Sequence, residues 1–242
     1  MATPAQNKKN IQKNKRTIFE VEAKVTANRA KAYATRSLIE ENRASILKNY
    51  TAAFMGNRQL ANQNTDDIFR NRKAVLSNMP TKNEVEENFV QSMINEANLD
   101  FLEHRAGLNA AVLGVNDKMV KANALLIEIN DAIMAANEGI VRFNAKEIAK
   151  NTEILNGKVK PSSATPAKNA ARVKKNASRG AEVAKKANAN SKKMDSLAVS
   201  MQANRKKIEK NAEKIMDRRA SILKNASNIS KNQERVAKYI SS

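Results

Sequence analysis

Apolar residues and asparagines recur along this chain at a fixed spacing. From residue 109 an Asn stands at every seventh position, and each one follows an apolar residue by three positions. The members of this unbroken series are Asn109, Asn116, Asn123, Asn130, Asn137, Asn144 and Asn151. A three-four spacing that repeats every seven residues is typical of the seam of a coiled coil, with the apolar residue at heptad position a and Asn at position d.

The same pairing extends over most of the remaining sequence. Further Asn residues that we assign to an assembly seam are Asn14, Asn28, Asn42, Asn49, Asn176, Asn204, Asn211, Asn225 and Asn232. The apolar residues assigned to it are Ile39, Ile46, Ile127, Val141, Ile148, Ile208, Ile222 and Ile229. The pattern therefore predicts helices that carry a polar layer in every heptad.

Proline and capping signals divide the pattern into helices. Pro4 and Pro166 each follow a Thr, which places an N-cap residue before Pro at the first helical position. Thr81 stands three residues before Glu84 and predicts a capping box at the start of the second helix. Gly157 and Pro161 predict a linker over residues 157–165.

These signals predict helix one within residues 1–80, helix two within 81–156 and helix three within 166–242, as one elongated structural unit. The Asn spacing lengthens to eight residues between Asn49 and Asn57, beside Gly56. An extra residue of this kind predicts a skip or a kink, absorbed as two four-residue stutters. The segment 2–7 also recurs with one change at 164–169, so helices one and three share a start signal and a register.

Charge differs sharply between the three helices. Residues 1–80 hold 15 Lys and Arg against 6 Asp and Glu, residues 81–156 hold 7 against 12, and residues 157–242 hold 22 against 6. An acidic helix two is expected to pack against both basic helices, which makes helices one and three parallel. The expected fold is all-α, with three long helices forming an elongated coiled-coil or three-helix-bundle rod with Asn layers in its seam.

The Asn layers have two interpretations. If they are buried, the amides can hydrogen-bond in rings across facing helices, while the apolar layers supply most of the stability. Alternatively, Asn lies at a solvated flank and the seam is formed by Ile together with neighbouring Leu or Ala.

The heptad with an apolar residue at a and Asn at d resembles stalk segments of trimeric autotransporter adhesins. In those stalks the Asn at d faces the three-fold axis and can hold anions. The resemblance covers the heptad alone, because no β-rich head, membrane anchor or signal peptide of that family is recognisable, and Pro80 and Pro161 interrupt a continuous stalk. It implies shared packing and not family membership.

Composition points away from catalysis. The chain has no Cys, one His (His104) and 4% aromatic residues, and its six Gly residues form no phosphate-binding loop. We therefore expect no enzyme activity, no cofactor, no metal and no small-molecule substrate. Neither a transmembrane segment nor a signal peptide is recognisable, so the expected location is the cytoplasm or a virion, with export only by a route without a classical signal peptide.

The formal net charge of +20 implies a negatively charged partner. Basic residues that could contact a polyanion such as nucleic acid or an anionic polysaccharide are Lys174, Lys175, Lys185, Lys186, Lys192, Lys193, Lys206, Lys207, Arg218 and Arg219. With few aromatic residues, nucleic-acid binding would be directed to the phosphate backbone. The same residues could equally form a solvated face, or meet the acidic face of another subunit.

These observations favour a non-catalytic structural protein that binds copies of itself and assembles into a filament, sheath, fibre or virion component. A second hypothesis is a basic architectural protein that coats or bundles nucleic acid. A third is a coiled-coil scaffold or adaptor for an acidic protein.

Overall fold

The computed structural model describes residues 2–241, and these residues are helical except at the connections. The elements are α1 (Pro4–Thr51), the π-helical turn η1 (Ala52–Asn57), α2 (Arg58–Ser77), α3 (Glu84–Leu155), the 3-10 turn η2 (Pro161–Ser163) and α4 (Pro166–Ser241). Because α1, η1 and α2 follow one another without a break, the chain has three long helical stretches. Residues 2–241 contain no strand, which confirms the all-α fold.

The two Thr-Pro starts are confirmed. Thr3 Oγ1 accepts a hydrogen bond from the amide of Gln6 at 3.2 Å, and Thr165 Oγ1 accepts one from the amide of Lys168 at 3.2 Å. Each hydroxyl satisfies one of the amides that a helix start leaves without an intrahelical acceptor.

The start of α3 differs from the expected capping box at Thr81. Asn83 is the N-cap, in an extended conformation, and its side chain accepts from the amide of Glu86 at 3.0 Å. The Glu86 carboxylate in turn accepts from the amide of Lys82 at 2.7 Å. Asn is among the best N-cap residues, so the helix begins two residues later than a Thr81 cap would allow.

Gly157 ends the turn after α3 in the left-handed region, with φ of +74°. Its amide donates to the Ile154 carbonyl at 3.0 Å, and the amide of Lys158 donates to the Glu153 carbonyl at 3.1 Å. These two bonds form a Schellman motif, which favours Gly because a side chain is strained at this φ.

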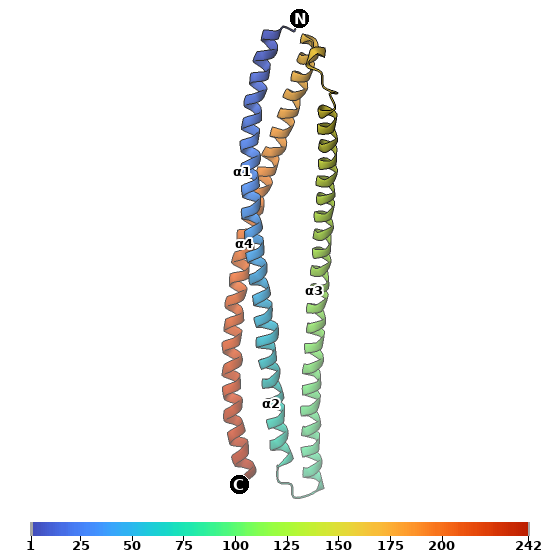
Figure 1. Ribbon diagram of the computed structural model, residues 1–242. Helices are drawn as coiled ribbons and strands as arrows, with labels where there is room; N and C mark the ends of the chain where they lie inside the picture. The colour runs from blue at the N-terminus through green and yellow to red at the C-terminus, as the bar shows by residue number, and fades with distance from the viewer. Residues whose placement is uncertain (1, 242) are drawn as a thin grey trace. The chain divides into compact units, whose positions relative to one another are not determined.

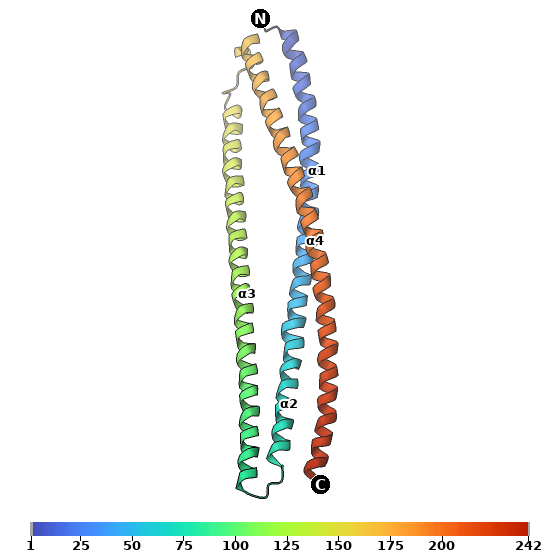
Figure 2. The same cartoon turned by 180° about the vertical axis from the view of Figure 1, so that it is seen from behind.

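The helices form two compact units, which are described separately. Unit 1 contains residues 2–59 and 160–221, and unit 2 contains residues 60–159 and 222–241. In unit 1, α1 and the first part of α4 start from neighbouring ends and lie side by side (Figures 1 and 2). The residues buried between them include Val173, Ala187 and Ile208 from α4.

In unit 2, α2 and α3 are joined by a short turn and lie antiparallel (Figure 2). The rings of Phe69 and Phe101 pack edge to face with centroids 5.1 Å apart. Arg72 pairs with Asp100 at 2.9 Å on this interface. Leu76 of α2 and Ala97 of α3 are buried.

On the other side of α2, unit 2 contains the last part of α4, where Ile229 is buried. Across residues 2–241, none of the helices combines the length and the hydropathy that crossing a membrane requires.

Candidate assembly interface

A ladder of asparagines joins α1 and α2 to α4. The side-chain Nδ2 of each Asn donates to a backbone carbonyl of α4, at 2.7 to 3.0 Å. The bonds run from Asn7 to Pro166, Asn14 to Val173, Asn28 to Ala187, Asn42 to Met201, Asn49 to Ile208 and Asn57 to Ile215 in unit 1, and from Asn64 to Ile222 in unit 2. We call this set the asparagine ladder.

The ladder fixes the direction and register of α1 relative to α4. Donor and acceptor are separated by 159 residues at every step from Asn7 to Asn49. A constant separation requires parallel helices, which confirms the parallel arrangement expected for helices one and three. The heptad positions without a bond are Val21 and Thr35, whose side chains carry no amide.

From Asn57, the last residue of η1, the separation between donor and acceptor becomes 158, and Asn64 keeps this value. Eight residues separate Asn49 from Asn57, whereas seven separate their acceptors Ile208 and Ile215. A π-helical turn holds one more residue than an α-helical turn, so η1 absorbs the additional residue and keeps the ladder in phase. The expected pair of stutters is therefore replaced by a single π turn.

The π turn is packed against α4. A Cβ added to Gly56 would lie 3.3 Å from the Arg219 guanidinium Nη1, so the absence of a side chain lets Arg219 lie close to this turn. Asn57 is 7% exposed, and its Oδ1 is buried without a hydrogen bond, as is Nε of Arg58. The additional residue thus has a local cost in unsatisfied polar atoms.

The ladder bonds also differ in kind from the expected rings of Asn. Each amide donates to a main-chain carbonyl, so the acceptor does not depend on the α4 side chain. A bond of this type contributes about 0.5–1.5 kcal/mol. Ion pairs from Lys31 to Asp195 at 2.7 Å and from Arg205 to Glu41 at 3.4 Å flank the ladder, but they are exposed and contribute little.

The opposite side of the α1–α4 pair is open. There, α1 presents its heptad a residues, which are about half-exposed, as with Ile18 at 56%. Facing them, α4 presents its d residues, including Val183 at 44%. By contrast, Asn42 at d of α1 is 8% exposed and Ala187 at a of α4 is 4% exposed. We call the surface between the a residues of α1 and the d residues of α4 the open groove.

In unit 1 the open groove contains a hollow of about 440 Å³. Val25 and Ala32 line it from α1, and Val183, Asn190 and Leu197 line it from α4. It is therefore apolar along its floor, with an amide from the d position of α4 among its walls.

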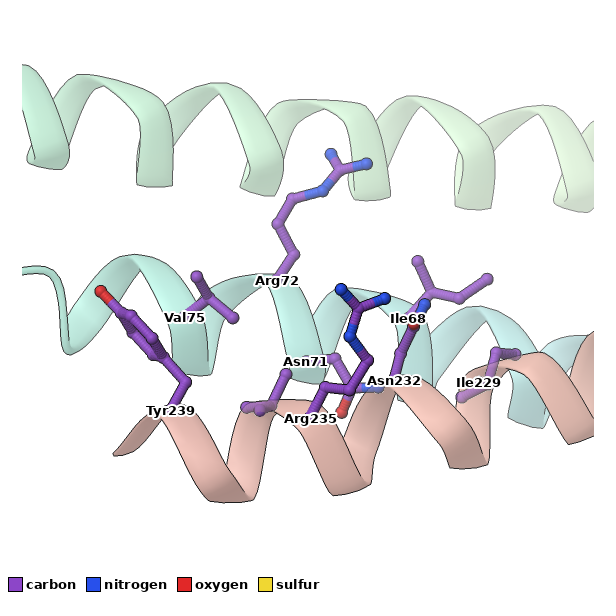
Figure 3. A pocket seen from close by; sticks show the side chains of 9 residues that line it. Ile68, Asn71, Arg72, Val75, Ile229, Asn232, Arg235 and Tyr239 are labelled. Atoms are coloured by element: carbon purple, nitrogen blue, oxygen red, sulfur yellow. The ribbon is translucent and has the colours of Figure 1, made fainter. Parts of the chain in front are cut away.

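In unit 2 a hollow of about 450 Å³ lies between α2 and α4 (Figure 3). Ile68 and Val75 line it from α2, at the same heptad position a that Val25 and Ala32 occupy in unit 1. Arg72, also from α2, extends toward α3, where it pairs with Asp100 (Figure 3). Each unit thus leaves the equivalent side of its parallel helix pair open.

α3 packs on α2 with a face that does not include its Asn heptad. The α3 residues at this contact include Ile94, Ala97, Phe101 and Arg105, and Arg105 forms an ion pair with Asp66 of α2. All of Asn109, Asn116, Asn123, Asn130, Asn137, Asn144 and Asn151 are exposed. The apolar seam residues of α3 are exposed too, with Ile127 at 61%. The burial expected for this helix does not occur within the described chain.

The other predicted seam residues divide between the ladder and the open groove. Asn14, Asn28, Asn42 and Asn49 are ladder donors, and Ile208, Ile222 and Ile229 lie at the covered a positions of α4. Ile39 and Ile46 lie at the a positions of α1, along the open groove. The predicted seam residues at the d positions of α4 are exposed: Asn176, Asn204, Asn211, Asn225 and Asn232.

The ten predicted polyanion-contact residues are all exposed on α4. Among them Lys186 alone forms an ion pair within residues 2–241, with Glu182 at 2.8 Å. The hydrogen bond and the charge of Lys186 lower the pKa of Glu182. Lys186, Lys193 and Lys207 occupy heptad position g beside the open groove, so part of the basic charge borders it.

The single histidine and the acidic residues do not gather into a metal site in the part of the chain that the structure describes. His104 is exposed, and its Nε2 lies 3.5 Å from Thr65 Oγ1. Residues 2–241 contain no group of three or more His, Cys, Asp or Glu that could hold a metal ion.

Sequence reasoning missed the carbonyl acceptors and the π turn. One signal for the π turn was present, because the Asn spacing lengthens to eight in the first helix while the matching α4 positions Ile208, Ile215 and Ile222 keep seven. No sequence signal distinguishes the covered side of the α1–α4 pair from the open side, since both helices carry the same heptad.

Comparison of the chain with models of protein families, with curated proteins and with solved structures finds no significant match.

Proposed function

We propose that this chain is a non-catalytic structural protein that assembles with copies of itself into a filament, sheath, fibre or virion component. The observation that supports it is the contrast between one satisfied Asn ladder and the same pattern left exposed elsewhere. The Asn residues of α1 donate to α4, while the open groove and α3 present further apolar and Asn positions to solvent. Extended exposed apolar surface of this kind is typical of protein–protein interfaces.

Charge sets the conditions for assembly. Copies with a net charge of +20 repel one another at low ionic strength, and salt of about 0.15 M screens that repulsion beyond roughly 8 Å. Contacts made by apolar residues and amides depend much less on salt. Assembly should therefore increase from low to moderate salt.

Negative-stain electron microscopy and multi-angle light scattering test the proposal on purified protein freed of nucleic acid. We expect ordered oligomers or filaments at moderate salt. Monomers at every salt concentration, with and without added polyanion, would contradict self-assembly and favour an adaptor for an acidic partner.

A second candidate function is backbone-directed binding of a polyanion. It is favoured by the ten exposed basic residues of α4, of which nine form no ion pair within the described chain. Their phosphate contacts would release counterions, so the logarithm of the binding constant should fall linearly with the logarithm of salt concentration. Retention of DNA that disappears steeply with salt, without ordered protein assemblies, would favour this function over the first.

A further inference from the structure

We infer that the open groove of unit 1 is the seat for α3 of a second copy of this chain, lying parallel to α1 and α4. This inference rests on the proposed self-assembly and names the two surfaces that meet. One surface is the open groove, and the other is the exposed heptad of α3 between residues 106 and 151.

The ladder shows what the groove lacks. Between α1 and α4, an Asn at d donates to the carbonyl at a of the parallel helix. Asn176 and Asn204 of α4 lie exposed at d along the open groove, and within the described residues of unit 1 no carbonyl accepts from their amides. A third parallel helix with the same heptad would accept from these amides, and its own Asn residues would donate to carbonyls of α1. The type of bond that links α1 to α4 would then link each of the three neighbouring helix pairs.

α3 carries apolar residues at heptad position a that match those of α1 along the groove, and we call each such series a column. The α1 column along the groove comprises Ile11, Ile18, Val25, Ala32, Ile39 and Ile46. The α3 column comprises Leu113, Val120, Ile127, Met134, Val141 and Ile148. Both repeat at the same seven-residue spacing, and each α3 member is followed three residues later by an exposed Asn. In the register that pairs the charges, the first layers of the α3 column lie beside the last layers of the α1 column, and burying them together removes exposed apolar surface from both copies.

Charge selects α3 over the basic helices. The g positions of α4 that border the groove carry Arg179, Lys186, Lys193, Lys207 and Lys214. In parallel helices the g positions of one face the e positions of the next. The e positions of α3 include Asp117, Asp131 and Glu138 and no basic residue between 106 and 151, whereas those of α1 include Arg29 and Arg36. A second α1 would therefore place like charges opposite each other.

Charge also selects the direction. An antiparallel helix brings its g positions to those of α4, and the g positions of α3 are apolar at Leu126, Ile133 and Ile140, with Glu147 as the single acidic residue among them between 106 and 151. Only the parallel direction brings all three acidic e residues of α3, Asp117, Asp131 and Glu138, to the basic g residues of α4.

One register of α3 along α4 places a lysine opposite each of the three acidic e residues of α3. It pairs Asp117 with Lys193, Asp131 with Lys207 and Glu138 with Lys214, each separated by 76 residues in sequence number. The same separation places Ala124 opposite Ser200, which is the uncharged one among the g positions of α4 that border the groove. Shifting by one heptad in either direction sets one of the three acidic residues opposite Ser200.

The parallel helix comes from a second copy because α3 runs the other way in its own chain. In unit 2, α3 lies antiparallel to α2 and covers the Phe69 side of that helix. The hollow between α2 and α4 remains open beside it (Figure 3). The chain's own α3 thus leaves this side of the parallel pair uncovered where the three helices adjoin.

Charge reversal tests the seat on the full chain. One variant carries Lys193→Glu, Lys207→Glu and Lys214→Glu, and a second carries Asp117→Lys, Asp131→Lys and Glu138→Lys. Each alone should assemble at least about tenfold more weakly, because like charges then face each other across the interface. Mixing the two variants should restore assembly, since the reversed α3 of one copy fits the reversed α4 of the other.

The matched control carries Lys185→Glu, Lys192→Glu and Lys206→Glu. These residues lie at heptad position f of α4, away from the open groove, and the three substitutions change the net charge by the same amount. The control should assemble like the parent at equal salt. Equal effects of the control and the groove variant would overturn the seat and attribute the effect to net charge. If only a chain carrying both reversals recovers, and the mixture does not, the contact is made within one chain and the second-copy assignment is wrong.

Introduced cysteines test the parallel direction of the second copy's α3. The chain has no cysteine of its own that could interfere. A chain with Ala124→Cys mixed with a chain with Ser200→Cys should give a covalent dimer of unlike chains on oxidation. Parent chains that assemble while this dimer is absent would overturn the seat and leave the proposed function standing. Parent chains that remain monomeric would instead contradict the proposed function itself.

Discussion

Replacing Asn42 by Asp tests the ladder directly. The Nδ2 of Asn42 donates to the Met201 carbonyl at 3.0 Å, and the residue is 8% exposed. A carboxylate of the same shape removes the donor and sets two acceptor oxygens against that carbonyl. The lost bond and the unsatisfied buried charge together cost at least about 3 kcal/mol. For a chain of this size that lowers the thermal midpoint by roughly 6–12 °C.

The matched control is Asn130→Asp, which makes the same chemical change on α3. Asn130 is exposed, so the control should stay within about 0.5 kcal/mol of the parent. Asn42→Leu is a second control, because it loses the bond but adds apolar surface, and the carbonyl keeps its own helical bond. It should remain within about 1.5 kcal/mol of the parent.

Thermal unfolding followed by circular dichroism measures all three variants, at concentrations where the protein is monomeric. Acidification that protonates the carboxyl introduced at position 42 restores a donor, so its deficit should shrink as pH falls. Equal midpoints for Asn42→Asp and Asn130→Asp would refute a buried ladder at position 42.

Three further predictions concern other features of the helices. Deleting Gly56 should convert the π turn to an α turn and raise the thermal midpoint by roughly 2–4 °C, or about 1 kcal/mol, and a lower midpoint would contradict the proposed cost of the turn. In differential scanning calorimetry Gly157→Ala should lose about 1 kcal/mol at its positive φ, whereas Gly139→Ala, which meets no atom within 4 Å, should gain up to about 1 kcal/mol. Phe101→Ala should lower the free energy of unfolding by about 2 kcal/mol and speed hydrogen exchange in α2. Phe143 is 61% exposed, so Phe143→Ala should change neither. Equal exchange in the two variants would argue against the ring contact on α2.

The sequence predicted the helices well because their start signals are local. Thr3 and Thr165 cap through their own hydroxyls, within three residues of the helix start. The start of α3 was misplaced because Thr81 and Asn83 are both good caps, and only the backbone conformation at Asn83 decides between them. Local chemistry therefore limits the choice to a few residues without always selecting one.

The candidate interface was predictable only in part. The heptad identifies which residues share a helix face, so Asn42 and Ile208 were both assigned to the seam. It does not identify the partner of each face, because α1, α3 and α4 carry the same pattern. The exposure of Asn130 and the ladder bond of Asn42 follow from which helix lies opposite, and that depends on the packing of the whole chain.

The main-chain acceptors of the ladder give its two sides unequal tolerance to mutation. On the acceptor side, the carbonyls belong to residues as different as Pro166, Ala187 and Met201, and the bond forms with each. These positions can drift among side chains that fit the space, since the accepting oxygen is common to every amino acid. On the donor side, a single atom exchange from amide to carboxylate abolishes the bond. Variation among descendants of this sequence should therefore accumulate at the a positions of α4, while the facing Asn residues of α1 remain fixed.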